Sequence, residues 1–169
     1  MGDIYREEKN KSSNLEVSDY YENADPHDIE NYRGLYRAGL VYEEKGNFNF
    51  IWYQDARKKY DAVIDLISAI DTTDRTPQEF EYFYKAHYRR IKMSIRFDCS
   101  NGSMTYEREK YCKELQWLIS ACNNFKDLVF LNKLYGNGDT FLKAKNLMKE
   151  KMEEVKAWAK NLIAELENI

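Results

Sequence analysis

Helix-breaking residues are scarce in this chain, which has 2 prolines and 7 glycines among its 169 residues. Its apolar runs are short, and none reaches the roughly 18 residues that a membrane-spanning helix needs. Opposite charges nearly balance, with 26 Lys and Arg against 29 Asp and Glu. The composition therefore argues against a membrane span and against the overall basic charge of many free-standing nucleic-acid-binding proteins.

Residues that bind metals or act as nucleophiles are few and poorly spaced. The three cysteines, Cys99, Cys112 and Cys122, form no CxxC pair, which argues against a disulfide framework and against a zinc knuckle. The two histidines, His27 and His87, stand in no HExxH or Glu-x-x-His motif. We therefore expect free thiols in a reducing cytoplasm, no metal, no cofactor and no enzymatic activity.

The chain does have strong helical periodicity, most clearly at its C-terminal end. On a helix over residues 139–169, nine apolar side chains fall within an arc of about 100°: Phe141, Ala144, Met148, Met152, Val155, Ala159, Leu162, Leu166 and Ile169. Asp139 or Thr140 can cap this helix. Because such a stripe cannot stay in water, we expect other helices to cover it, with this helix packed along at least two of them.

Four more helical segments precede this one. They are expected at residues 25–46, 49–70, 76–97 and 104–123, with a further apolar segment at 125–135. Asp25-Pro26 is a start signal for the first, and the capping box Thr76-Pro77-Gln78-Glu79 opens the third. The sequence therefore predicts an all-α bundle of five or six helices in one domain, residues 25–169, without a sheet.

The first two of these helices resemble a single tetratricopeptide repeat. The matching positions carry its small and aromatic residues: Leu35, Ala38, Gly39, Tyr42, Gly46, Ala56 and Tyr60. The resemblance covers about 35 residues, requires an insertion of about five between the helices, and is not followed by a second copy. It implies an antiparallel helical hairpin in which Gly39 permits a close crossing.

The third helix carries the sharpest candidate binding site. Lys85, Arg89, Lys92 and Arg96, called here the basic stripe, fall within about 60° of arc, opposite Phe83, His87 and Ile91. Tyr82, Tyr88 and Met93 border the stripe, so basic and aromatic groups are expected on one exposed side that suits phosphates and stacked bases. The alternative is an ordinary solvated face, or a stripe neutralised by acids of the N-terminal region. On the opposite side, His87 is expected to be a hydrogen-bonded core histidine.

A second candidate site is an acidic, aromatic arm near the N-terminus. Residues 1–24 lack periodicity and are expected to form a flexible arm. Between Glu16 and Glu30 there are six acids and no Lys or Arg. Asp19, Tyr20, Tyr21 and Glu22 are its candidate binding residues, and they suit docking onto a basic surface. The alternative is a solvated tail that leads into an acid-rich helix start.

These features predict a non-enzymatic interaction protein that binds a surface of a larger protein or nucleoprotein complex. Its 14 tyrosines suit a binding surface and equally the boundary of a helical core. The composition is similar to that of inhibitors encoded by phages and mobile elements against host nucleic-acid enzymes, such as anti-CRISPR proteins. Two alternatives stay open: a nucleic-acid-binding protein that uses the third helix, and a structural or self-associating helical subunit.

Overall fold

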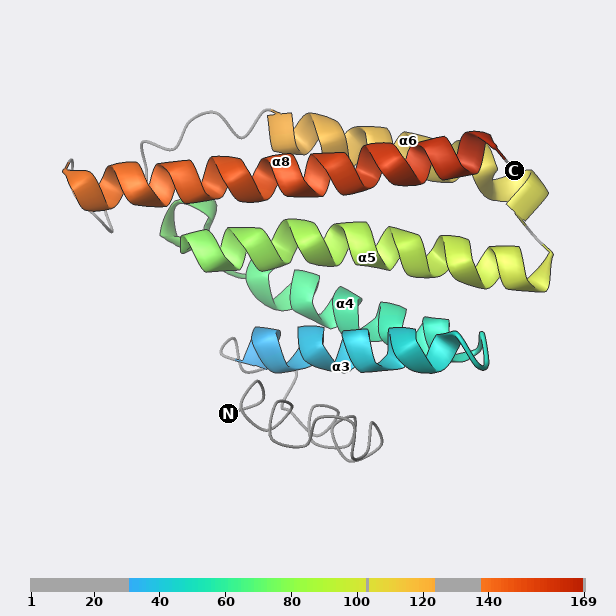
Figure 1. Ribbon diagram of the computed structural model, residues 1–169. Coiled ribbons are helices and arrows are strands. Elements are labelled where there is room, and N and C mark those ends of the chain that lie inside the picture. The colour runs from blue at the N-terminus through green and yellow to red at the C-terminus, as the bar shows by residue number, and fades with distance from the viewer. Residues whose placement is uncertain (1–30, 103, 124–137, 169) are drawn as a thin grey trace.

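The computed structural model describes residues 31–102, 104–123 and 138–168. These residues form five α-helices and a short 3-10 helix: α3 (Tyr32–Gly46), α4 (Trp52–Ser68), η2 (Thr72–Asp74), α5 (Pro77–Asn101), α6 (Met104–Asn123) and α8 (Asp139–Glu167). The described ranges contain no strand, so the predicted all-α fold is confirmed (Figure 1). The arm, the Asp25-Pro26 start signal and the 125–135 segment lie outside the described residues.

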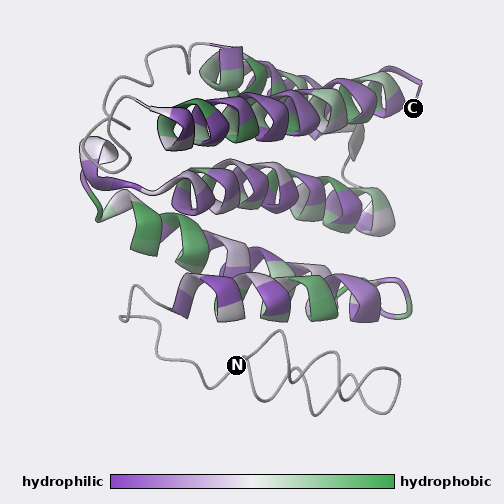
Figure 2. Cartoon of the chain, turned by 60° about the vertical axis from the view of Figure 1, so that its left-hand side comes forward, coloured by the Kyte–Doolittle hydropathy of each residue, from purple (hydrophilic) through white to green (hydrophobic). Residues whose placement is uncertain are grey.

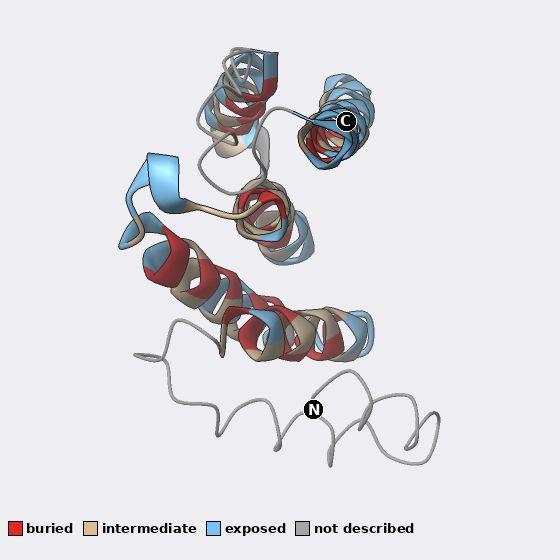
Figure 3. Cartoon of the chain, turned by 90° about the vertical axis from the view of Figure 1, so that its left-hand side faces the viewer, coloured by how far each residue is buried: buried red, intermediate tan, exposed pale blue. Residues whose placement is uncertain are grey.

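Helix α5 is the centre of the arrangement. The antiparallel pair α3 and α4 packs on one side of it, and α6 and α8 pack on the other (Figures 1 and 3). The C-terminal helix was expected to pack along at least two other helices, and its contacts with α5 and α6 confirm this. The central place belongs to α5. Helix α5 holds this place because it buries residues on two opposite sides, Ile91 and Ile95 toward α6 and α8, and Ala86 and Met93 toward α3 and α4.

The start of α5 follows from its capping box. The Thr76 backbone N–H donates to Glu79 Oε1 over 2.8 Å, and the Glu79 backbone N–H donates to Thr76 Oγ1 over 3.2 Å. Pro77 occupies the first turn, where its missing N–H costs no hydrogen bond. The predicted start is confirmed, and the helix continues one turn beyond Phe97 to a left-handed Gly102 with φ of 83°.

The predicted close crossing in the α3–α4 hairpin is also confirmed. A Cβ atom at Gly39 would lie 2.5 Å from Tyr60 Cε1, and one at Gly46 would lie 2.3 Å from the ring of Tyr53. Any side chain at either glycine would overlap an aromatic ring, since real Cβ contacts are longer than this. The two glycines therefore let the tyrosines of α4 lie directly on the backbone of α3.

The apolar stripe of α8 is buried as predicted, from Ala144 to Leu166, against α5 and α6. Its predicted cap is wrong. Asp139 is the first helical residue, Gly138 precedes it, and no side chain caps the helix. Ile169 lies outside the described residues.

Two buried clusters share α5. The aliphatic cluster lies between α5, α6 and α8 and is built mainly from Leu, Ile, Met, Val and Ala. The tyrosine cluster lies between α3, α4 and α5 and includes Tyr32, Tyr36, Tyr42, Tyr53 and Tyr60. Figure 2 shows hydrophilic and hydrophobic residues sharing each of these helices, as expected for amphipathic helices. No helix in the described ranges is both long and apolar enough to cross a membrane.

Candidate functional site: the basic stripe and its cleft

The basic stripe of α5 lies between α3 on one side and α8 on the other. Its first two members are not on an exposed side, since the side chains of Lys85 and Arg89 are only 15% and 19% exposed. The prediction that all four cations face solvent is therefore wrong. Periodicity correctly placed them on one face of α5, but that face is covered by acids and aromatic rings from two other helices.

Arg89 is held in a network that joins α5 to the hairpin. Its Nε donates to Tyr36 Oη over 2.6 Å, and its Nη1 donates to both carboxylate oxygens of Glu43, over 3.2 and 3.1 Å. The hydroxyl of Tyr60 donates to the same carboxylate over 2.7 Å. The guanidinium also lies over the rings of Tyr36 and Trp158. Arg89 is thus a largely buried structural cation that donates to Tyr36 and Glu43.

The pKa values of this network show the same tight coupling. Burial raises the pKa of Tyr36 to about 12, although Arg89 opposes the shift. Burial, then Glu43, raises the pKa of Tyr60 well above its ordinary value. Burial alone would lower the pKa of Arg89, but Tyr36, Glu43 and Tyr60 together raise it above the ordinary value for arginine. Both phenols are therefore neutral and Arg89 is charged near neutral pH.

Two other stripe residues, Lys85 and Arg96, also face acids. Lys85 Nζ lies 2.8 Å from Glu81 Oε2 and 3.7 Å from Glu154 Oε1 of α8. Arg96 Nη2, nearer the solvent, lies 3.8 Å from Glu165 Oε2. The neutralising acids that the structure describes thus come from α3, α5 and α8, whereas the sequence suggested the N-terminal region. Asp19, Tyr20, Tyr21 and Glu22 of that region lie outside the described residues.

The residues that border the stripe also pack against other helices and are buried or half-buried. Tyr82 packs edge-on against Tyr32 and Tyr36, with ring centroids 5.2 and 4.9 Å apart. Tyr88 packs against Trp158 of α8 at 5.3 Å. Met93, predicted at the edge of an exposed face, is 1% exposed in the tyrosine cluster. These half-buried tyrosines do not form the open stacking surface that the sequence suggested.

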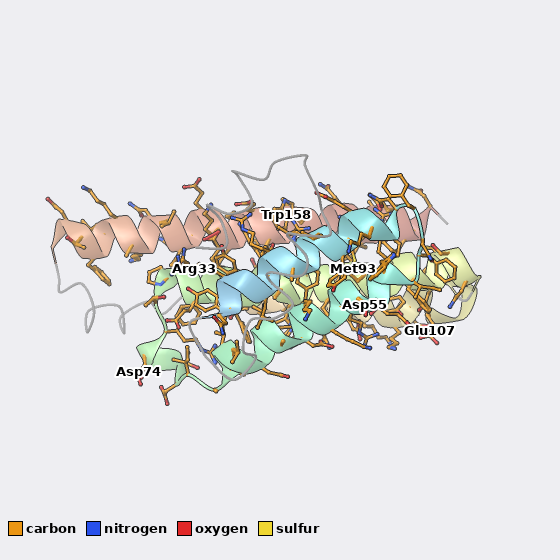
Figure 4. The ribbon with its side chains drawn as sticks, turned by 90° about the horizontal axis from the view of Figure 1, so that it is seen from below. Arg33, Asp55, Asp74, Met93, Glu107 and Trp158 are labelled. Atoms are coloured by element: carbon orange, nitrogen blue, oxygen red, sulfur yellow. The ribbon has the colours of Figure 1, made fainter. Side chains whose placement is uncertain are left out.

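What remains open is a cleft at the C-terminal half of the stripe. It has a volume of about 370 Å³ between the end of α3, the start of α4 and α5, and it is lined by Glu43, Glu44, Asn47, Tyr53, Lys92, Met93 and Arg96. Tyr53 Oη donates to Asn47 Oδ1 over 2.8 Å, which fixes one end of the cleft. Figure 4 views the bundle from below and labels Met93 on α5 and Trp158 on α8.

Lys92 is the stripe cation that the fold leaves available. Among the described residues, no carboxylate oxygen lies within 4.0 Å of its Nζ. Burial lowers the pKa of Lys92, although Glu43 opposes the shift. Lys92 and the solvent-facing Arg96 thus form a basic wall opposite the acidic wall of Glu43 and Glu44.

The opposite face of α5 carries His87, where a second prediction is wrong. His87 is enclosed by Phe83 and Trp117, at centroid distances of 4.7 and 5.3 Å, but its buried Nδ1 has no hydrogen-bond partner within the described ranges. Burial and then the nearby Arg90 lower the pKa of His87 to about 4. Arg90 faces this side as well, with its Nε 3.5 Å from Asp61 Oδ1. His87 is therefore a neutral ring packed between aromatic rings near neutral pH.

Sequence reasoning missed a further feature, the tip of the α3–α4 hairpin. Phe48 is 95% exposed there, and Ile51 is exposed too. The signal was in the sequence, where Phe48, Phe50, Ile51 and Trp52 crowd a connection between two helices that is normally polar. The tip adjoins the cleft, because Asn47 lines the cleft and directly precedes Phe48.

Groups able to hold a metal do not gather in the described part of the chain, where no cluster of three His, Cys, Asp or Glu occurs. Cys99 is exposed and Cys112 half-buried, while burial raises the pKa of the Cys122 thiol to about 12. Comparison with protein-family models, with curated proteins and with solved structures found no match to this chain.

Proposed function

We propose that this chain is a non-enzymatic interaction protein that binds a protein surface through the cleft lined by Lys92 and Arg96. The observation that carries the proposal is the division of the basic stripe. Lys85 and Arg89 are committed to internal partners, whereas Lys92 and Arg96 line an open cleft together with Glu43, Glu44, Asn47 and Tyr53. A cleft with both charges and with polar groups suits the mixed contacts of a protein–protein interface.

Charge reversal tests this proposal. The variant Lys92→Glu with Arg96→Glu should lose a partner that the tagged wild-type chain captures at constant stoichiometry from its source cells, as measured by quantitative mass spectrometry. The matched control is Lys110→Glu with Lys113→Glu, which makes the same charge change at two exposed lysines of α6. A partner kept by the cleft variant, or the absence of any stoichiometric partner, would contradict the proposal.

Direct nucleic-acid binding is the second candidate, and the same two cations favour it. Its expected signature is weak. Only Lys92 and Arg96 would contact phosphates, and the pairing of Arg96 with Glu165 is exposed and so contributes little, which gives a slope of about −2 in log affinity against log salt, at about 0.9 per phosphate. Fluorescence anisotropy with single-stranded and duplex DNA and RNA measures this slope. A slope near −2 that disappears in the cleft variant would favour nucleic-acid binding. Binding that is independent of salt, or too weak to detect, would rule this function out.

Inhibition of a nucleic-acid-processing enzyme is a narrower form of the proposal. It is supported by composition alone, so it is tested after the partner is known. The cleft variant should then lose inhibition of that enzyme, while the α6 control keeps it.

A further inference from the structure

The hairpin tip holds an aromatic side chain out in water on a fixed backbone. The backbone N–H groups of Asn47, Phe48 and Asn49 donate to carbonyls of Glu44 and Lys45, and that of Ile51 donates to Asn49 Oδ1. Phe50 packs on Phe97 of α5, with centroids 5.4 Å apart. The tip is therefore preorganised, and Phe48 is presented without a loop that must first be ordered.

The residues around the tip hold it in place. Trp52 stacks on Tyr42 at 5.4 Å, and Lys45 Nζ lies over both rings, 4.7 and 5.1 Å from their centroids. The basic side chain nearest to Phe48 in sequence is thus turned toward the hairpin's own aromatics. Glu44 and Asp55 flank the same tip with negative charge. This pattern disfavours an anionic lipid surface, which attracts clustered Lys and Arg.

The tip lies beside a cleft that suits its ring. The cleft's 370 Å³ exceeds the volume of one phenylalanine side chain, and its lining includes the two cations Lys92 and Arg96, while Met93 and Tyr53 lie buried beneath it. A phenyl ring that enters this cleft can make cation–π contacts with these two side chains. Phe48 is 95% exposed, so it does not fill the cleft of its own chain.

We infer that the chain self-associates by a reciprocal contact, in which Phe48 of each copy enters the cleft of a second copy. A two-fold contact needs a self-complementary patch, and a projecting ring next to a cleft that accepts it meets this need. The formal net charge of −3 is small enough to let two copies approach. Two rings and their surroundings bury less than a standard interface does, so the dimer should be weak, with a dissociation constant in the micromolar range or above.

This inference does not rest on the proposed function, but the two use the same cleft. A second copy seated at Lys92 and Arg96 would compete with any other protein for that place. Partner binding should then weaken as the concentration of the chain rises, which would make self-association a regulatory step.

Sedimentation velocity on the full chain under reducing conditions tests the inference, over a range of about 10 μM to about 1 mM. Phe48→Ala removes the ring, and Lys92→Trp fills the cleft. Leu142→Ala is the control, because Leu142 is also half exposed and lies on the N-terminal part of α8, at the other end of the molecule from the tip. The wild type and the control should form dimers, and each cleft or tip variant should dimerise about 100-fold less tightly or worse, since two rings lose their burial.

Mixing the two variants separates this contact from simple ring stacking. An equimolar mixture of Phe48→Ala and Lys92→Trp retains one intact ring and one open cleft per pair, so it should dimerise better than either variant alone. A wild type that stays monomeric throughout, a dimer unchanged by Phe48→Ala, or a mixture without recovery would each overturn the inference. So would Phe48-dependent flotation with phosphatidylcholine and phosphatidylserine vesicles in place of dimers. Phe48→Ala tests the inference even if Lys92→Trp fails to fold, because the exposed Phe48 side chain can be removed without disturbing the core.

Discussion

The aliphatic cluster and the tyrosine cluster each pack a pair of helices against α5, but they use different side chains to do so. The aliphatic cluster relies on burial of Leu, Ile, Met, Val and Ala between α5, α6 and α8. The tyrosine cluster adds polar groups, because phenols of Tyr36 and Tyr60 contact the Arg89–Glu43 pair. Burial is the main source of stability in the first, whereas the second also depends on each buried donor and acceptor keeping its partner. The stability of the aliphatic cluster should therefore fall when buried side-chain volume is removed. The stability of the tyrosine cluster should fall when a hydrogen-bond or ion-pair partner is removed or when the pH changes its charges.

The sequence misled most about the side of α5 that carries the basic stripe. A stripe of aliphatic residues has a single interpretation, burial. Tyr, Arg and Lys are found on binding surfaces and in hydrogen-bonded cores alike, so their helical spacing could not separate the two.

Removing Arg89 should produce the largest effect. Arg89→Met leaves the Glu43 carboxylate largely buried without its cation, which should lower the free energy of unfolding by about 3–5 kcal/mol. Urea denaturation measures the change. Adding Glu43→Gln to the same chain removes the stranded charge and should recover part of the loss. An effect within about 0.5 kcal/mol would mean that the pair contributes little to folding.

Truncating the aliphatic cluster should cost nearly as much, for a different reason. Leu162→Ala removes buried volume and leaves a cavity between α8 and its neighbours, so the free energy of unfolding should fall by about 2–5 kcal/mol. The control Leu142→Ala, at an exposed position of the same helix, should change stability by less than about 0.5 kcal/mol. Equal effects at both positions would contradict the packing of α8.

Low pH and high pH should lower stability through residues on opposite sides of α5, His87 at low pH and Tyr36 at high pH. The folded pKa of His87 is about 4, below the ordinary 6.5, so its contribution is present above pH 6.5 and is lost as pH falls toward 4. The folded pKa of Tyr36 is about 12, above the ordinary 10, so its contribution is present below pH 10 and is lost as pH rises toward 12. Each loss in the free energy of unfolding should be about 3 kcal/mol.

Thermal melts across pH measure both losses. His87→Phe should flatten the acid limb and leave the alkaline limb unchanged. Tyr36→Phe should reduce the alkaline loss, although Tyr60 will still contribute to it. A single variant that flattens both limbs would show that the two sides do not titrate separately.

The smallest expected effect concerns the close crossing in the hairpin. Gly39→Ala drives a Cβ into the Tyr60 ring, and the strain should exceed the gain in helix propensity, for a net loss of about 1–2 kcal/mol. Gly138→Ala is the control, because nothing lies within 4 Å of its Cβ position. If both substitutions stabilise the protein, the tyrosine ring moves aside easily and the crossing is not tightly packed.

The sequence alone determined the helical elements, because their signals are local. The capping box at Thr76, the spacing of the α8 stripe and the glycine at position 39 each express a rule that acts within a few turns of helix. Only the tertiary structure decided which helix is central and what the charged face of α5 contacts. Glu43, Glu154 and Glu165 lie far from that face in sequence, and their positions depend on how the hairpin and α8 dock. Whether a cation meets water or a carboxylate is a question about neighbours in space, which periodicity along one helix does not contain.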